Sequence, residues 1–244
     1  MLSEYSWGTL GVIWLGALIG AIASGGAGFA FVLAAASIWL HVLDPVRTAI
    51  LSLASSTLMQ LGTIWPLLPH VKAERVGPFI VTGLVGIPLG VWLLTRTDAS
   101  VMKIGLGAFL TTFGLYALLA PRLPVITGGG RVADAVVGFL GGILGGIGGY
   151  SGVLPTIWTQ LRGWPKIEAR AVYQPYILVI QIATIAVVGI IALDRTTVML
   201  QLAILPPLAV GGWLGWRFFS MLDERMFRKV IAALLVISGV TLVL

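Results

Sequence analysis

Apolar runs longer than any core helix requires recur along almost the whole chain. Only 10% of the 244 residues are charged and 58% are hydrophobic, whereas soluble domains carry about 25% charged residues. So few polar groups cannot coat a water-facing globule of this size. The runs also lack the alternating pattern of membrane β-barrel strands, which are about ten residues long. The sequence therefore predicts an all-α polytopic membrane protein and excludes a soluble enzyme or a disordered chain.

The formal net charge of +6 does not indicate nucleic-acid binding, because the basic residues stand singly between apolar runs. The chain has no cysteine, which excludes disulfides and thiolate metal sites. His41 and His70 lie near opposite interfaces without metal-ligand or catalytic spacing. No nucleophile–base cluster falls inside an apolar segment. We therefore expect no enzyme activity, no cofactor and no metal, and an intramembrane enzyme is the least favoured function.

The apolar segments fall into two sets of five separated by a short linker. They cover about 7–23, 29–43, 48–69, 76–95 and 102–120, then 132–147, 151–162, 171–193, 197–216 and 229–244. This predicts a first repeat at residues 1–120, a linker at residues 121–131 and a second repeat at residues 132–244.

Individual residues recur with the segments. Gly20 and Gly26 correspond to Gly142 and Gly148 at a spacing of 122 residues. Gln60 answers Gln181 at a spacing of 121 residues. Such a duplicated unit is common among secondary transporters.

The second segment of each half is too short to cross a membrane comfortably. The two segments have 15 and 12 residues, or roughly 22 and 18 Å of helix, against a hydrocarbon core of about 30 Å. Each follows an uncharged glycine-rich break, at Ser24 to Gly28 and at Gly145 to Gly152. We predict two glycine-rich re-entrant helical hairpins, and therefore about ten segments. The alternative is that each pair is one broken helix, which gives eight spans.

The distribution of Lys and Arg favours the hairpins slightly. When each hairpin enters and leaves by one face, eleven basic residues fall on one side and four on the other, against ten and five for broken helices. The richer face, which includes Arg75 and Lys166, is predicted to be cytoplasmic. Each unit then starts and ends on opposite faces, so the two repeats are inverted. Broken single spans would make them parallel.

The two breaks are the candidate binding site. Non-helical backbone at membrane depth is tolerated only where it lines a cavity or is buried in protein. Helices beginning near Phe29 and Val153 would direct free N–H groups and positive dipole ends toward the midplane, which suits an anion. The polar side chains nearby are neutral. Candidate substrate-binding residues are Ser24, Gly25, Gly26, Gly28, Gln60, Gly148, Gly149, Tyr150, Ser151, Gln174 and Gln181.

Structural roles compete with this interpretation. Gly138, Gly142 and Gly146 recur every four residues and form a ridge for helix packing. An interhelical hydrogen bond explains Gln60 or Gln181 without a ligand. The charged residues Asp44, Arg47, Glu168 and Arg170 lie at segment ends, so we interpret them as interfacial ion pairs or lipid-headgroup contacts.

The breaks, together with the stretches Pro45 to Ala49 and Pro165 to Ala171, resemble the twin motifs of the TauE/SafE sulfite exporter family. Gly90 to Lys103 and Gly215 to Arg228 resemble that family's second motif in each half. Ser24 stands where the family often has glycine. The resemblance covers nearly the whole chain. It implies a permease that moves sulfite or organosulfonates across a bacterial-type cytoplasmic (inner) membrane.

We therefore expect a small anionic substrate and the lipid bilayer as partners, and no nucleic acid. A homo-oligomer is left open. Two other functions remain: a metabolite carrier of the ten-helix, five-plus-five type, which would lack the hairpins, and a non-transporting scaffold whose glycine ridges serve subunit assembly.

Overall fold

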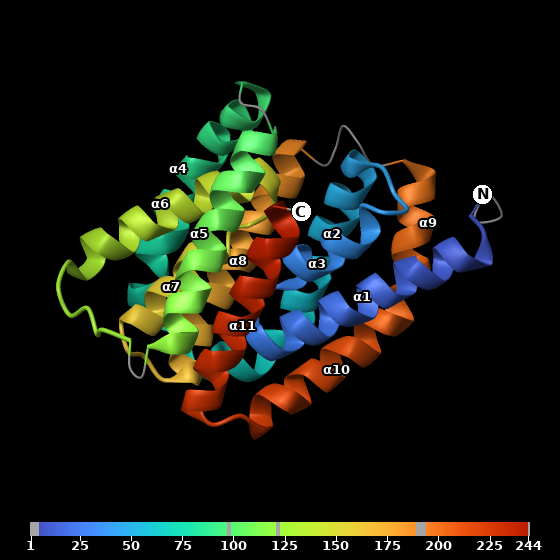
Figure 1. Ribbon diagram of the computed structural model, residues 1–244. Coiled ribbons are helices and arrows are strands. Elements are labelled where there is room, and N and C mark those ends of the chain that lie inside the picture. Colours follow the sequence, from blue (N-terminus) through green and yellow to red (C-terminus); the bar gives the residue numbers. More distant parts are fainter. Residues whose placement is uncertain (1–4, 97–98, 121–122, 189–193, 244) are drawn as a thin grey trace.

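A computed structural model describes residues 5–96, 99–120, 123–188 and 194–243. Every regular element in these ranges is helical (Figure 1). The elements are α1 (Trp7–Ala27), α2 (Phe31–Trp39), α3 (Pro45–Thr63), the 3-10 helix η2 (Trp65–His70), α4 (Ala73–Arg96), α5 (Ala99–Leu119), α6 (Gly130–Gly148), α7 (Val153–Leu161), α8 (Lys166–Val188), α9 (Arg195–Ala203), α10 (Leu205–Met221) and α11 (Glu224–Val243). Asp98 of the second motif and residues 121–122 of the linker lie outside the described residues.

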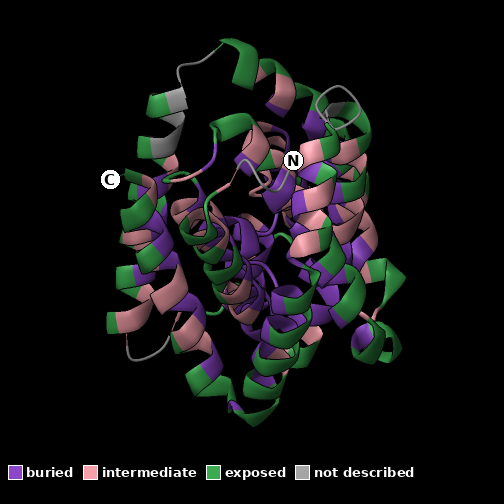
Figure 2. Ribbon diagram, turned by 90° about the vertical axis from the view of Figure 1, so that its right-hand side faces the viewer, coloured by how far each residue is buried: buried purple, intermediate pink, exposed green. Residues whose placement is uncertain are grey.

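Within the described residues, five helices are long and apolar enough to cross a membrane: α1, α4, α6, α8 and α11. The pair α9 and α10, bent by 47°, makes a sixth candidate if it is one span. The chain is therefore a multi-pass helical membrane protein. Large apolar side chains cover the outside, with Trp7 90% exposed. Figure 2 shows buried residues gathered in the interior.

Proline divides two of the predicted segments. Segment 48–69 becomes α3 and η2, which meet at Ile64 just before Pro66. Segment 197–216 becomes α9 and α10, which meet at Ile204 before Pro206. Proline has no N–H to continue the helical hydrogen bonds and its ring clashes with the preceding turn. The prediction of one uninterrupted segment at each of these two places was wrong.

Small residues bring three pairs of helices into backbone contact: α1 with α10, α4 with α6, and α5 with α11 (Figure 1). A Cβ added to Gly25 of α1 would lie 2.7 Å from the carbonyl oxygen of Gly212. A Cβ on Gly146 of α6 would lie 2.5 Å from the carbonyl oxygen of Ile87. One on Gly239 would lie 2.6 Å from that of Gly107. These glycines are needed for packing.

The order of contacts gives the helix directions. Phe79 and Ile87 of α4 meet Gly138 and Gly146 of α6 in the same order, so these helices are parallel. The pair α1 and α10 is also parallel, because Ala21 meets Gly211 and Gly25 meets Gly215. The pair α5 and α11 is antiparallel, because Gly107 meets Val243 and Gly114 meets Val236.

Each short helix runs back along the helix before it. On α2, Phe31 lies beside Gly20 of α1, and Trp39 lies further back, where its Nε1 donates to the carbonyl of Ile13 at 2.9 Å. On α7, Trp158 likewise returns toward the start of α6 and donates to Asp134 Oδ1 at 2.7 Å.

The helices α3 and α8 form the centre. Of the five span candidates, α8 is the most enclosed, with 61% of its apolar window buried. Thr63 of α3 contacts Gln174 of α8, while the earlier residue Ser56 contacts the later residue Gln181. These two helices are therefore antiparallel.

Two solvent-facing ion pairs join distant elements. Arg47 near the start of α3 bonds to Asp194 at the start of α9, with Nη2 and Oδ2 3.0 Å apart. Arg75 of α4 bonds to Glu168 near the start of α8. The interfacial interpretation of Arg47 and Glu168 is thus consistent with their contacts.

Candidate functional site

The first break lies at Gly28 to Ala30, a few residues later than expected. The helix α1 continues through Ser24 to Ala27, and Gly28 ends it in a left-handed conformation with φ of 84°. The Gly28 N–H donates to the carbonyl of Ser24 at 2.6 Å. Only glycine enters this conformation without steric cost. The prediction that helix stops at Ser24 was wrong because small residues continue a helix where a neighbour, here α10, packs against them.

The second break lies at Gly149 to Gly152, inside the predicted stretch. Gly149, with φ of 78°, ends α6. Its N–H donates to the carbonyl of Gly145 at 2.9 Å, and the N–H of Tyr150 donates to that of Leu144 at 3.2 Å. The bond from the left-handed Gly149 to Gly145 is the αL ending of a helix. Both glycine-rich stretches therefore do interrupt a helix.

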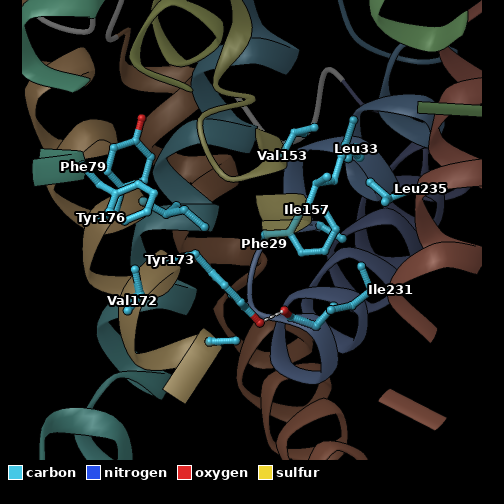
Figure 3. Packing of buried hydrophobic residues seen from close by; sticks show 14 of the residues in the cluster. Phe29, Leu33, Phe79, Val153, Ile157, Val172, Tyr173, Tyr176, Ile231 and Leu235 are labelled. Carbon is cyan, nitrogen blue, oxygen red and sulfur yellow. Dashed lines mark hydrogen bonds between the residues drawn. The ribbon is translucent and has the colours of Figure 1, made fainter. Parts of the chain in front are cut away.

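The two breaks contact each other and α8. A Cβ added to Gly152 would lie 2.9 Å from Cβ of Phe29 and 2.5 Å from Cδ1 of Ile177. A Cβ on Gly149 would lie 3.6 Å from Val32 of α2. Figure 3 shows Phe29 beside Val153 and Ile157 in one packed cluster.

Buried donors meet the carbonyl end of α1 at the first break. The Tyr173 hydroxyl donates to the carbonyl of Ala27 at 2.6 Å (Figure 3). Gln60 Nε2 donates to the carbonyl of Gly28 at 2.9 Å. Arg170, which is fully buried, donates Nη1 to Gly26 and Nη2 to Ser24 at 3.4 Å each. The break therefore presents carbonyl oxygens as well as amides.

A polar seam continues from this point between α3 and α8. Gln174 Nε2 donates to Thr63 Oγ1 at 2.7 Å, and Gln181 Nε2 donates to Ser56 Oγ at 2.8 Å. Several buried polar atoms have no hydrogen-bond partner, among them Gln60 Oε1, Gln181 Oε1 and Ser151 Oγ. Such atoms are costly in an apolar interior unless something satisfies them. The seam is therefore the part of the interior best suited to a polar ligand.

The short helices offer fewer free amides than the sequence suggested. The helix α2 begins at Phe31 rather than near Phe29, and no side chain caps it. The helix α7 begins at Val153, whose N–H already donates to the carbonyl of Tyr150 at 3.2 Å. Pro155 in its first turn has no N–H at all. Free backbone N–H groups were expected at both helix starts, and α7 supplies fewer of them than expected.

The expected site residues divide into two groups. Around the first break and the seam lie Ser24, Gly26 and Gly28 through their carbonyls, and Gln60, Gln174 and Gln181 through their side chains. Gly25 packs on α10, and a Cβ on Gly148 would meet the Tyr150 ring at 2.6 Å. Gly149 and Ser151 lie at the second break.

Arg170 was missed as a candidate. Its place close to Lys166 and Glu168 suggested an interfacial residue, but it is 0% exposed. Its guanidinium lies over the rings of Trp216 and Phe219, with 4.7 and 4.4 Å from Cζ to the ring centroids. The helical spacing of Arg170, Gln174 and Gln181 on one face of α8 was a signal that could have found it.

Two cavities lie near the surface of the described residues, and neither is lined by Arg170 or by a glutamine of the seam. One of about 390 Å³ lies between α2, α5 and α11, and its lining includes Tyr150 of the second break, His41 and Ser238. The other, of about 530 Å³, is lined by Arg75, Arg131, Asp134, Arg162, Trp164 and neighbouring residues.

Apolar spanning helices, two helix breaks in contact and a buried polar seam between α3 and α8 are typical of a polytopic membrane transporter. The family model "Sulfite exporter TauE/SafE" matches residues 12–242, and the chain belongs to this family. It is therefore a membrane transporter for small anions and not an enzyme. No curated protein and no solved structure matches the chain.

Proposed function

We propose that the protein is a permease that moves a small sulfur-containing oxyanion, sulfite or an organosulfonate, across a bacterial-type cytoplasmic membrane. The binding site lies between the two helix breaks, along the seam of α3 and α8. The observation that carries this proposal is that the two breaks contact each other and that each has a buried polar atom without a partner, Gln60 Oε1 beside the first break and Ser151 Oγ in the second. In an apolar protein such groups are expensive and mark functional positions.

An inverted repeat explains the directions of the helices. Residues 1–120 and 132–244 form the two units, joined by the linker at 121–131. Corresponding helices α3 and α8 are antiparallel, as are α5 and α11. In the two units α1 corresponds to α6, and α4 corresponds to α10. The contacting pairs α1–α10 and α6–α4 are therefore equivalent, and both are parallel. This exchange of partners is what an in-plane twofold axis produces.

Another contact supports re-entrant hairpins. The Arg47 side chain at the start of α3 donates to the Tyr5 hydroxyl just before α1, at 2.8 Å. The chain therefore returns after α2 to the end from which α1 set out. The ten-segment arrangement with both breaks at membrane depth accounts for this return. A single broken span would place Tyr5 and Arg47 at opposite ends.

The polar lining suits an anion better than a metal cation. Asp134 is the only buried carboxylate among the described residues, and it accepts a hydrogen bond from Trp158 instead of facing the seam. The Ser151 hydroxyl can donate to an anion, and Nε2 of Gln60 and of Gln181 each carry a second N–H beyond their bonds to Gly28 and Ser56. A hard cation instead requires several carboxylates or carbonyls. The two cavities would give access from opposite faces in turn.

Flux measured in proteoliposomes tests this proposal. Gly28→Ala places a side chain at φ of 84°, with its Cβ 2.8 Å from the Tyr173 ring and 3.2 Å from Arg170 Nε. Gly163→Ala is the matched control, because its φ of 68° is similarly strained but the three atoms nearest its Cβ all belong to Val125. Each costs about 1–2 kcal/mol of backbone strain. We expect protein-dependent uptake of labelled sulfite or methanesulfonate that Gly28→Ala lowers at least about tenfold, while Gly163→Ala keeps it.

Three outcomes contradict parts of the proposal. Equal flux per folded molecule in the two variants would remove the first break from the site. Transport of neutral or cationic metabolites, without anions, would favour the ten-helix metabolite carrier. No flux of any solute from well-folded protein would favour the scaffold.

A further inference from the structure

Arg170 is a buried cation without a carboxylate partner. Its side chain is fully enclosed. The ion pairs among the described residues involve Arg47 and Arg75, and no described carboxylate lies within 4.0 Å of the Arg170 guanidinium. An isolated charge in an apolar interior is strongly unfavourable unless it is compensated. Something other than a protein carboxylate must balance it.

The groups around Arg170 compensate the charge only in part. Nε donates to Gln174 Oε1 at 2.8 Å. The bonds to the carbonyls of Gly26 and Ser24 are 3.4 Å long, well beyond the usual 2.9–3.0 Å. A guanidinium has five N–H donors, so two of them have no acceptor among the described residues. The Trp216 and Phe219 rings add cation–π contact but no negative charge.

We propose that Arg170 is the fixed counter-charge of the transported anion, and that the site selects monoanions, such as a sulfonate or hydrogen sulfite, over dianions. This rests on the proposed permease function and names its charge-binding residue. A guanidinium binds two oxygens of an –SO₃ group with parallel hydrogen bonds. A single positive charge neutralises a monoanion, whereas a dianion would leave one uncompensated negative charge in a buried site.

A second cation, Lys166, lies near Arg170 toward the start of α8. Lys166 lies one helical turn before Arg170 on α8, and its Nζ donates to the carbonyls of Phe219 and Leu222. The Phe219 ring contacts both cations, with Lys166 Nζ 4.9 Å from its centroid. The Glu224 carboxylate accepts from the backbone N–H of Lys166 and offsets its charge. Lys166 is therefore a compensated cation, and Arg170 remains the uncompensated charge inside.

Anion valence is the first test, and it uses the wild-type protein. A ligand that binds the folded state raises the melting temperature. Methanesulfonate and sulfate have similar oxygen geometry but one and two charges, and they are compared at equal ionic strength. We expect methanesulfonate to raise the melting temperature and to compete with labelled sulfonate uptake at a concentration at least about tenfold lower than sulfate.

Matched arginine variants are the second test. Arg170→Gln removes the charge and should weaken methanesulfonate binding at least about tenfold, equivalent to about 1.4 kcal/mol. Arg170→Lys keeps the charge and loses the two-pronged geometry, so binding should weaken while the preference for the monoanion remains. Arg47→Gln is the control, because Arg47 is partly exposed and pairs with Asp194. Any sulfate effect that persists in Arg170→Gln is general salt stabilisation.

The outcomes separate this inference from the permease proposal. If Arg170→Gln keeps both the flux and the methanesulfonate affinity of wild type, Arg170 is not the counter-charge, and the permease proposal stands. Wild type that binds sulfate as tightly as methanesulfonate overturns the monoanion preference, even if Arg170→Gln fails to fold. Absence of any anion flux or binding in wild type overturns both.

Discussion

Adding one methyl group at either of two neighbouring glycines of α1 should change the melting temperature by different amounts. A Cβ on Gly25 would lie 2.7 Å from the carbonyl oxygen of Gly212, 3.0 Å from Cα of Gly215 and 3.1 Å from the amide nitrogen of Trp216. A Cβ on Gly26 would find its nearest neighbour, the carbonyl oxygen of Gly215, at 3.6 Å. Both residues are in the last turn of α1, so the change in helix propensity is nearly the same for both.

The difference between the variants isolates the cost of overpacking. Ordinary contacts begin near 3.4 Å, so Gly25→Ala must push α1 and α10 apart by roughly 0.7 Å. A gap of 0.5–1 Å forfeits about a quarter to a half of the dispersion energy across an interface. Overpacking of this kind costs about 1–3 kcal/mol. For a chain of this size, each kcal/mol lowers the melting temperature by roughly 2–4 °C.

Intrinsic fluorescence of the nine tryptophans in detergent reports the melting temperature. We expect Gly25→Ala to melt roughly 2–12 °C below Gly26→Ala. Gly105→Ala, where nothing lies within 4 Å of the new Cβ, measures the propensity effect alone. Identical melting temperatures for the Gly25 and Gly26 variants would refute the close approach of α1 and α10.

Three further predictions address other contacts. Trp39→Phe leaves the carbonyl of Ile13 without its 2.9 Å donor in a buried position, so we expect a loss of about 1–3 kcal/mol in thermal unfolding, with anion affinity unchanged. Hydrogen bonds from the Thr197 hydroxyl and amide, and the Arg47 guanidinium, hold the pKa of Asp194 below its usual value. The resulting stability is present above the unfolded-state pKa of about 3.9 and disappears as the pH falls through the lower folded-state pKa. Asp194→Asn should therefore melt below wild type at pH 7, and the two melting temperatures should converge as the pH falls below the folded-state pKa of Asp194; a difference that stays constant with pH would contradict this. Ser151→Ala removes a buried hydroxyl without a partner, so an unchanged or higher melting temperature with weaker anion binding is expected, and unchanged binding would exclude Ser151 from the site.

Local chemistry was enough to predict much of this architecture. Run lengths of apolar residues located the helices, and glycine-rich stretches located both interruptions. Gly28 and Gly149 end their helices in left-handed conformations that glycine alone adopts readily. The short helices after them were also expected, since few apolar residues separate each break from the next polar residue.

Long-range contacts account for what the sequence did not reveal. Ser24 to Ala27 stay helical because α10 packs against them, and nothing in their own composition indicates that partner. Arg170 is buried by the end of α1 and by two rings of α10, from parts of the chain far from its own segment. Gln60 and Gln181 were recognised as a pair, but they bond to Gly28 and Ser56 instead of to each other.

The two solvent-facing ion pairs lie at opposite ends of the helix bundle. Arg47–Asp194 lies at the start of α3 and Arg75–Glu168 near the start of α8, and these two helices are antiparallel. Exposed pairs of this kind contribute little to stability. Each end of the bundle is therefore tied across distant elements by a contact that breaks at small energetic cost.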